Sequence, residues 1–225
     1  MMKFFFLVFS LVISSISLNA QNLISNSGFE TNNGWSILKL NDPILVKADS
    51  THSALKGKNA IGVYVSDMSQ AKSDNRTFIQ TKLSKPLIKG KYYRFKVHCK
   101  LSEYSTHSSR SLGAMFTNEN ISDEAISSYI NNNPSIDFGV KIGSNYYNNK
   151  AIKNSSHLKY WTKENTVFID QIYEAKGGEQ YLTIGNFYDK NSIYLYHLFN
   201  YGQNENTYSY YILDEVSLVE VKMNK

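Results

Sequence analysis

The chain has 225 residues, of which 42% are hydrophobic, and its 24 Lys and Arg against 19 Asp and Glu give a formal net charge of +5. This length suits one domain with a full core, and because the basic residues are scattered singly we expect no nucleic-acid partner. The one cysteine, Cys99, excludes an intramolecular disulfide. Stability must therefore come from packing and from any bound metal ion.

Residues 1–20 have the pattern of a secretory signal peptide. Lys3 precedes an apolar run that starts at Phe4, and small and polar residues lead to Ala20. The apolar run is too short to span a bilayer, so we expect cleavage after Ala20 and export of residues 21–225. No later stretch contains eighteen consecutive apolar residues, and the sequence predicts no transmembrane segment.

Short strands are predicted along almost the whole exported chain. In the clearest, 92–101, every second side chain is apolar and those between are mostly basic, so Cys99 is expected in the core and His98 on the wet face. Further strands are predicted at 44–48, 59–65, 76–83, 111–117, 136–140, 162–169, 179–186 and 208–222. Such spacing, broken by turn residues, is typical of an all-β sandwich, and we expect a single domain over 21–225.

Two long polar stretches interrupt this pattern. One short helix is predicted at 122–130, with Ser122 as its N-cap and acidic residues in the first turn. Otherwise the Asn-, Ser- and Tyr-rich stretches 118–160 and 188–207 are expected to be loops over the rigid sheets. Binding sites usually lie on such loops.

Catalytic motifs offer little support for an enzyme. The sequence contains no nucleophile elbow, H-E-x-x-H zinc motif, P-loop or dinucleotide fingerprint. Glycoside hydrolysis needs only two carboxylates at the right separation. We therefore expect a non-catalytic protein, with a carboxylate-based, glycoside-active enzyme as the third alternative.

Glu30 and Asp214 are candidates for a cation site. Period two places Asp214 on the same face of the last predicted strand as Ile212, Val216 and Leu218. An inward carboxylate is costly unless it is paired, hydrogen-bonded or bound to a metal. If the first strand, which Glu30 ends, lies beside the last, the two carboxylates could meet and would repel without a hard cation such as calcium. The alternative is that Asp214 accepts hydrogen bonds from the backbone or from a lysine.

Several segments resemble a known fold family. The sequence is similar to the galactose-binding-like jelly roll of carbohydrate-binding modules in "NLISNSGFE", "SALKGKNAIGVYV" and "YYILDEVSLVEV". It resembles more narrowly a domain of secreted Bacteroidetes surface proteins in "FIQTKLSKPLIKGKYYRFKVHCKLSEYS", "SLGAMF" and "YWTKENTVFIDQIYEAKGGEQYLTIGNFYD". Together these segments cover most of residues 22–222.

This resemblance implies a fold, a location and a metal. The fold is a jelly-roll β-sandwich of two antiparallel sheets, and the location is outside the cytoplasm of a Gram-negative bacterium: secreted, periplasmic or at the cell surface. Many relatives hold a structural calcium ion, and their motif maps its carboxylate ligands onto Glu30 and Asp214. Lys58 or a neighbour in 49–59 would supply a backbone carbonyl. Gly177 and Gly178 would turn the chain into the penultimate core strand.

The tyrosines of the two polar stretches are the candidate ligand-binding residues: Tyr146, Tyr147, Tyr194, Tyr196 and Tyr201. Sugars stack on exposed aromatic faces while their hydroxyls bond to nearby polar groups. We therefore expect a binding module for a glycan or another cell-surface ligand. Two alternatives stay open. The tyrosines could instead hold the loops on the sandwich, and the protein could bind an envelope protein or serve a structural role.

Overall fold

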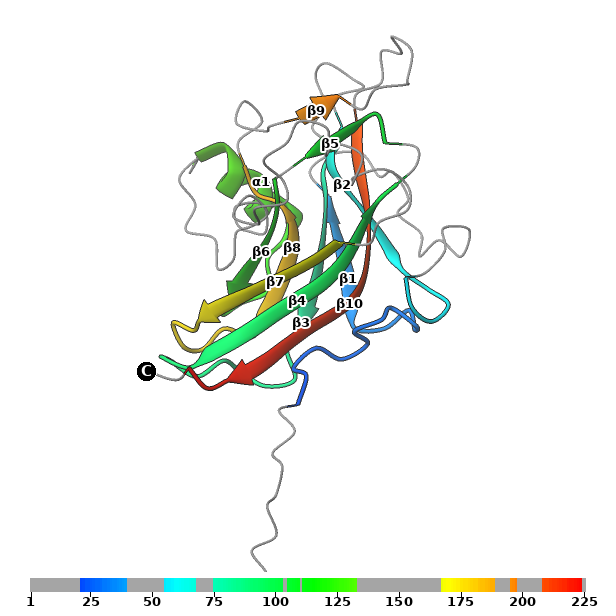
Figure 1. The fold of residues 1–225 in the computed structure, drawn as a ribbon. Helices are drawn as coiled ribbons and strands as arrows, with labels where there is room; N and C mark the ends of the chain where they lie inside the picture. The colour runs from blue at the N-terminus through cyan, green and yellow to red at the C-terminus, as the bar shows by residue number, and fades with distance from the viewer. Residues whose placement is uncertain are drawn as a thin grey trace, which may run out of the picture.

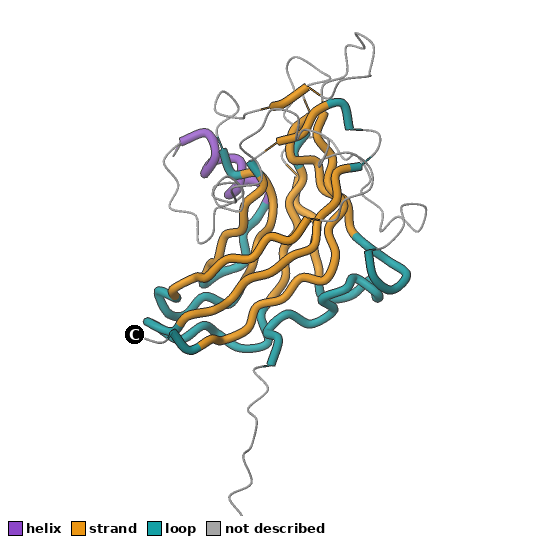
Figure 2. The backbone as a smooth tube through the Cα atoms, viewed as in Figure 1, coloured by secondary structure: helices purple, strands orange, loops and turns teal. Residues whose placement is uncertain are grey.

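The fold is a sandwich of two four-stranded antiparallel sheets (Figure 1). The computed structural model describes residues 21–39, 55–67, 75–102, 105–109, 111–132, 167–188, 195–197 and 208–223. The first sheet has the order β1 (Trp35–Lys39), β3 (Thr77–Lys82), β8 (Tyr181–Asn186), β6 (Leu112–Thr117). The second has the order β2 (Ile61–Asp67), β10 (Tyr208–Val221), β4 (Tyr92–Leu101), β7 (Val167–Glu174). The predicted all-β, jelly-roll class with one short helix is confirmed (Figure 2).

The main core lies between the two sheets. Alternation in β4 sends Phe95, Val97 and Cys99 inward, all at most 3% exposed, and leaves the residues between them facing outward. The Phe95 ring meets Phe116 of β6 edge-on at 6.2 Å, which ties the second sheet to the first. Burial raises the pKa of the Cys99 thiol to about 12, so this thiol is an inert part of the core.

A second, smaller core lies on the outer face of the first sheet, under helix α1 (Asp123–Asn132). Its helix side chains are Ile126 and Ile130, which pack on Phe78 of β3 and Met115 of β6. The hydroxyl of Ser122 accepts a hydrogen bond from the Ala125 N–H at 3.2 Å, which confirms the predicted N-cap. The helix therefore covers the first sheet and not the second (Figure 1).

The turn between β7 and β8 is built around a buried glutamate. Gly177 and Gly178 have φ values of 100° and 92°, which only glycine adopts without strain. Glu179, only 3% exposed, accepts hydrogen bonds from the Tyr173 hydroxyl at 2.7 Å and from the N–H groups of Lys176 and Gly177 at 2.6 and 2.8 Å. The two glycines therefore make the turn into β8, as the sequence predicts.

The last strand, β10, changes face part-way along its length. Its core side chains are Tyr211, Leu213, Val216 and Leu218. The pairing with β4 shifts register between Asp214 and Ser217, and Glu215 has a positive φ of 50°. Because of this bulge, Ile212 and Asp214 lie on the outer face while the later core residues point inward. The prediction that Val216 and Leu218 share a face with Asp214 is wrong.

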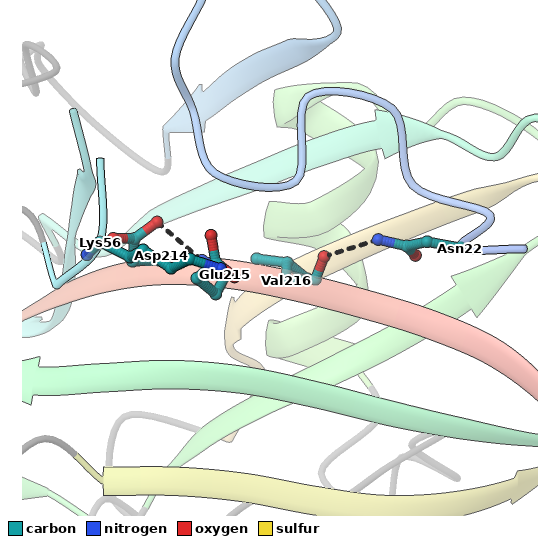
Figure 3. A network of polar contacts seen from close by, with 5 residues as sticks. All are labelled: Asn22, Lys56, Asp214, Glu215 and Val216. Atoms are coloured by element: carbon teal, nitrogen blue, oxygen red, sulfur yellow. Dashed lines mark hydrogen bonds and ion pairs between the residues drawn. The ribbon is translucent and has the colours of Figure 1, made fainter. Parts of the chain in front are cut away.

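The N-terminal segment runs beside β10 without forming a strand. The Leu23 N–H donates to the Leu218 carbonyl, and the Val216 N–H donates to the Ser27 carbonyl, both at 2.8 Å. The Asn22 side-chain amide adds a bond to the Val216 carbonyl at 3.3 Å (Figure 3). The first and last parts of the chain are thus neighbours as expected, although no strand ends at Glu30.

The other strand predictions differ in outcome. Those at 59–65, 76–83, 92–101, 111–117, 179–186 and 208–222 are confirmed by β2, β3, β4, β6, β8 and β10. The predicted strand 162–169 overlaps β7, which runs on to Glu174, and those at 44–48 and 136–140 lie outside the described residues. Three short strands were not predicted: β1, β5 (His107–Ser109) and β9 (Leu195–His197).

Candidate functional site

Three carboxylate side chains gather beside the loop that precedes β2, and we call Glu30, Asp214 and Glu215 the acidic corner. A Cβ atom placed at Gly28 would lie 3.3 Å from Glu215 Oε1 and 3.8 Å from Asp214 Oδ1. The same point lies 3.9 Å from Glu30 Cγ. The structure thus brings Glu30 and Asp214 to one corner of the molecule, as the sequence predicts.

Asp214 is fully buried, and its carboxylate accepts backbone hydrogen bonds. Oδ2 accepts from the Lys56 N–H at 2.8 Å and Oδ1 from the Glu215 N–H at 2.7 Å, while Lys56 Nζ lies 3.2 Å from Glu215 Oε2 (Figure 3). Burial raises the pKa of the Asp214 carboxyl, and these N–H donors offset only part of that effect. The hydrogen bonds match the alternative in which no metal is needed.

Glu30 closes the same loop from the other side. Its Oε1 accepts hydrogen bonds from the N–H groups of Lys58 at 2.8 Å and Asn59 at 3.3 Å. A Cβ atom at Gly57, where φ is 78°, would lie 2.0 Å from that same oxygen. Only glycine allows the backbone to pass this close to the carboxylate. Lys58 therefore meets Glu30 through its N–H group.

Calcium at the acidic corner stays a prediction. Carboxylate and carbonyl oxygens are the ligands that calcium prefers, so the chemistry of the corner suits the ion. Within the described ranges, however, no three or more His, Cys, Asp or Glu side chains are arranged to hold a metal. The contacts seen at Glu30 and Asp214 are N–H donors, so the geometry fits the hydrogen-bonded alternative better. Calcium would need carbonyl ligands, such as the one expected from Lys58.

A chelator experiment decides between the two. Bound calcium would stabilise the folded state by about 2.7 kcal/mol at a free concentration of 100 times its Kd, so EDTA should lower the melting temperature. Asp214→Asn should remove most of that response, and Asp170→Asn, at an exposed carboxylate on β7, should keep it. A melting temperature that EDTA leaves unchanged would show that hydrogen bonds alone close the corner.

A second candidate site lies where β2 and β10 meet, and we call Tyr64, Tyr208 and Tyr210 the tyrosine cluster. Tyr64 and Tyr210 are directly opposite each other in the register, and their ring centroids are 4.6 Å apart. The Tyr208 ring meets Tyr64 edge-on at 6.1 Å. All three side chains are half-buried. The cluster therefore offers aromatic surface on the outer face of the second sheet.

A glycine shapes this cluster. A Cβ atom at Gly62 would lie only 1.6 Å from the Tyr210 hydroxyl oxygen. The Tyr210 ring therefore occupies the space in which a side chain of β2 would otherwise stand. Because Gly62 has no side chain, the ring can lie down along the sheet.

Two buried hydroxyl groups lie beside the tyrosines. Ser66 and Ser209 are directly opposite each other in the register and are at most 1% exposed. Within the described ranges, neither hydroxyl oxygen has a hydrogen-bond partner. Buried polar groups of this kind are rare, and a buried water molecule would satisfy them.

The short strand β5 is attached to the start of β10 by side-chain hydroxyls. Ser105 Oγ accepts from the Tyr210 N–H at 3.0 Å, and Thr106 Oγ1 accepts from the Tyr208 N–H at 3.0 Å. The Tyr211 hydroxyl donates to the Ser109 carbonyl at 2.9 Å. Strand β9 pairs with β5, so both strands lie at the end of the sandwich away from the C-terminus (Figure 1).

The predicted ligand-binding tyrosines are only partly placed. Tyr196 lies in β9, opposite Ser108 of β5. Strand β5 is bonded to the part of β10 that carries the tyrosine cluster, so Tyr196 belongs to the same end of the molecule. The other four, Tyr146, Tyr147, Tyr194 and Tyr201, lie outside the described residues. The binding role of all five stays a prediction.

The sequence analysis did not identify the tyrosine cluster as a site. Tyr208 and Tyr210 alternate with inward-facing residues in "YSYYIL", and this period-two pattern marks them as outward-facing. Nothing local reveals that Tyr64 and Gly62 lie beside them. That neighbourhood depends on the register of β2 with β10.

No protein-family model and no curated protein matches this chain. Solved structures of low similarity include the CBM22-1 xylan-binding domain from Paenibacillus barcinonensis, 14% identical with a TM-score of 0.41, covering 91% of this chain and 97% of that one. The K3 cleaved adhesin domain of Lys-gingipain from Porphyromonas gingivalis is 8% identical with a TM-score of 0.44, covering 87% and 98%. The enzymatically active domain of bacteriophage CBA120 tailspike protein 4 is 9% identical with a TM-score of 0.42. The match covers 89% of this chain but only 21% of that domain.

At such low identities and TM-scores, these similar structures do not indicate what this chain binds or does. The two-sheet architecture itself is established by the strand order. None of the helices in the described parts of the chain has the length and apolarity to cross a bilayer.

Proposed function

We propose that this chain is an exported, non-catalytic module that binds a glycan at the end of the sandwich where β2 and β10 meet. The observation that carries the proposal is the tyrosine cluster, in which three half-buried rings meet on the outer face of the second sheet. Aromatic surface of this kind suits a sugar, because sugar rings have apolar faces that stack on aromatic side chains. The tyrosines predicted from the sequence stay further candidates, and of these Tyr196 lies in β9, at the same end of the molecule.

The proposed location follows from the signal-peptide pattern of residues 1–20. Glycans and other envelope components are the ligands that an exported domain meets, at the cell surface, in the periplasm or outside the cell. An envelope protein is the alternative partner, because a tyrosine-rich surface also suits a protein–protein contact.

Binding should be weak and shared among a few side chains. An aromatic contact contributes about 0.5–1.5 kcal/mol per well-placed ring beyond area burial. Loss of one ring should therefore weaken binding about two- to tenfold. We expect Tyr64→Ala and Tyr208→Ala to show this loss on a glycan array. In the same array, Tyr146→Ala, Tyr147→Ala and Tyr196→Ala test the loop predictions.

Tyr92→Ala is the matched control. Tyr92 is also half-buried on the outer face of the second sheet, but it lies at the far end of β4, opposite Val221 at the end of β10. It should bind like wild type, and all variants should be compared at equal fractions folded. If the wild-type protein binds no glycan on the array but pulls down one envelope protein, the protein-binding alternative replaces this proposal.

A further inference from the structure

Cleavage of the signal-peptide pattern places an exposed glutamine at the start of the exported chain. The expected cut after Ala20 leaves Gln21 as the first residue. The Gln21 side chain is exposed, and within the described parts of the chain it makes no hydrogen bond. Its side-chain amide is therefore open to solvent, beside the α-amine that cleavage would release.

The two residues after Gln21 are fixed to the sandwich. Asn22 accepts a hydrogen bond from the Leu218 N–H at 2.9 Å, and its side-chain amide donates to the Val216 carbonyl at 3.3 Å (Figure 3). Leu23 is only 1% exposed, and its N–H donates to the Leu218 carbonyl at 2.8 Å. Gln21 thus lies directly before the point at which the chain joins the fold, and nothing in the described sandwich holds its side chain.

A terminal glutamine contains both reactants of a ring closure. The α-amine nitrogen attacks the side-chain carbonyl carbon Cδ, and a five-membered lactam forms as the new N–Cδ bond replaces the Cδ–Nε2 bond. The amine gives up a proton, and Nε2 leaves with it as ammonia. No oxidant, reductant or second substrate is consumed. Because both groups belong to the same residue, the reaction is favoured by proximity.

We propose that Gln21 is a modification site and that the exported chain begins with pyroglutamate. This inference rests on the proposed export and not on the proposed glycan ligand. The lactam removes the positive charge of the terminal amine and leaves an aminopeptidase no free α-amine to bind. It therefore protects the start of the segment that places Leu23, Ile24 and Phe29 in the core.

Mass spectrometry of the N-terminal peptide tests the proposal. The full chain, including residues 1–20, is produced in an exporting Gram-negative host together with an exported glutaminyl cyclase, the enzyme class that catalyses this ring closure. The peptide is expected to begin at Gln21 and to be lighter by the mass of one ammonia. Edman degradation should be blocked, and treatment with a pyroglutamyl aminopeptidase should release the block.

Gln21→Asn is the matched control, because its side chain is one methylene group shorter and the same closure would need a strained four-membered ring. This variant should keep a free amine and lose its first residue to an added aminopeptidase, while wild type keeps its full length. A wild-type peptide that begins at Gln21 with a free amine would overturn the modification and leave export in place. A chain that keeps residues 1–20, or begins at another residue, would overturn the cleavage site as well. Glycan binding is measured separately on the array and is contradicted by neither result.

Discussion

Replacing Phe95 with alanine is expected to lower the free energy of unfolding by about 3–5 kcal/mol, as for other buried aromatic residues. Phe95 is completely buried in β4, and its ring meets Phe116 of the opposite sheet edge-on. Phe116 in turn stacks on Tyr173 of β7 at 4.5 Å. Truncation of Phe95 therefore leaves a cavity between the sheets and removes a contact that joins them.

Urea unfolding of the wild type, Phe95→Ala and Ile88→Ala measures this effect. Ile88 is an apolar residue that is 52% exposed, so its truncation should change the free energy of unfolding by no more than about 0.5 kcal/mol. Similar losses in the two variants would mean that Phe95 does not lie in a shared core.

Replacing Glu179 with glutamine is expected to cost about 1–3 kcal/mol of stability, although the two side chains have almost the same size. Oε2 of the carboxylate accepts from the Gly177 N–H and Oε1 accepts from the Lys176 N–H. An amide has only one oxygen, so its NH₂ group would face one of these N–H donors. Glu174→Gln, at an exposed glutamate three residues before the turn glycines, is the control and should cost little.

The same site predicts a dependence on pH. Burial alone would raise the pKa of the Glu179 carboxyl, but the hydrogen bonds from Tyr173 and the backbone outweigh it and lower the pKa. A lowered pKa in the folded state means that the stabilisation is fully present above the unfolded value and is lost as the pH falls through the folded value. The melting-temperature gap between wild type and Glu179→Gln should therefore be largest near neutral pH and narrow in acid. A gap that stays constant down to acid would contradict the proposed role of the charge.

Most strands of the two sheets were predicted correctly, because a strand with one buried face has an apolar side chain at every second position, and the sequence shows this pattern directly. The alternation in 92–101 marks β4 to the residue, since one face of the strand must be apolar. The short strand β5 has no such pattern. Hydrogen bonds to the hydroxyls of Ser105 and Thr106, and not apolar packing, hold its start on β10. The bulge after Asp214 was missed for a similar reason. It depends on a positive φ at Glu215, and a glutamate in a sequence gives no sign that its φ will be positive.

The sequence predicted that Glu30 and Asp214 could meet, but it did not predict the tyrosine cluster. Glu30 and Asp214 do meet beside the same loop, because the two ends of the chain are neighbours. Their partners, the N–H groups of Lys56 and Lys58, come from a loop whose path no periodicity encodes. The tyrosine cluster needs the register of β2 with β10, which is a long-range property of the fold.

The most direct test of glycan binding at the tyrosine cluster is the dissociation constant of the best-bound polysaccharide, measured by isothermal titration calorimetry for wild type, Tyr210→Ala and Tyr92→Ala. The proposed site predicts that Tyr210→Ala binds several-fold more weakly while Tyr92→Ala binds as wild type does, with all three proteins folded at the temperature of measurement. Equal affinities of Tyr210→Ala and wild type would contradict it and would place the binding surface elsewhere on the molecule.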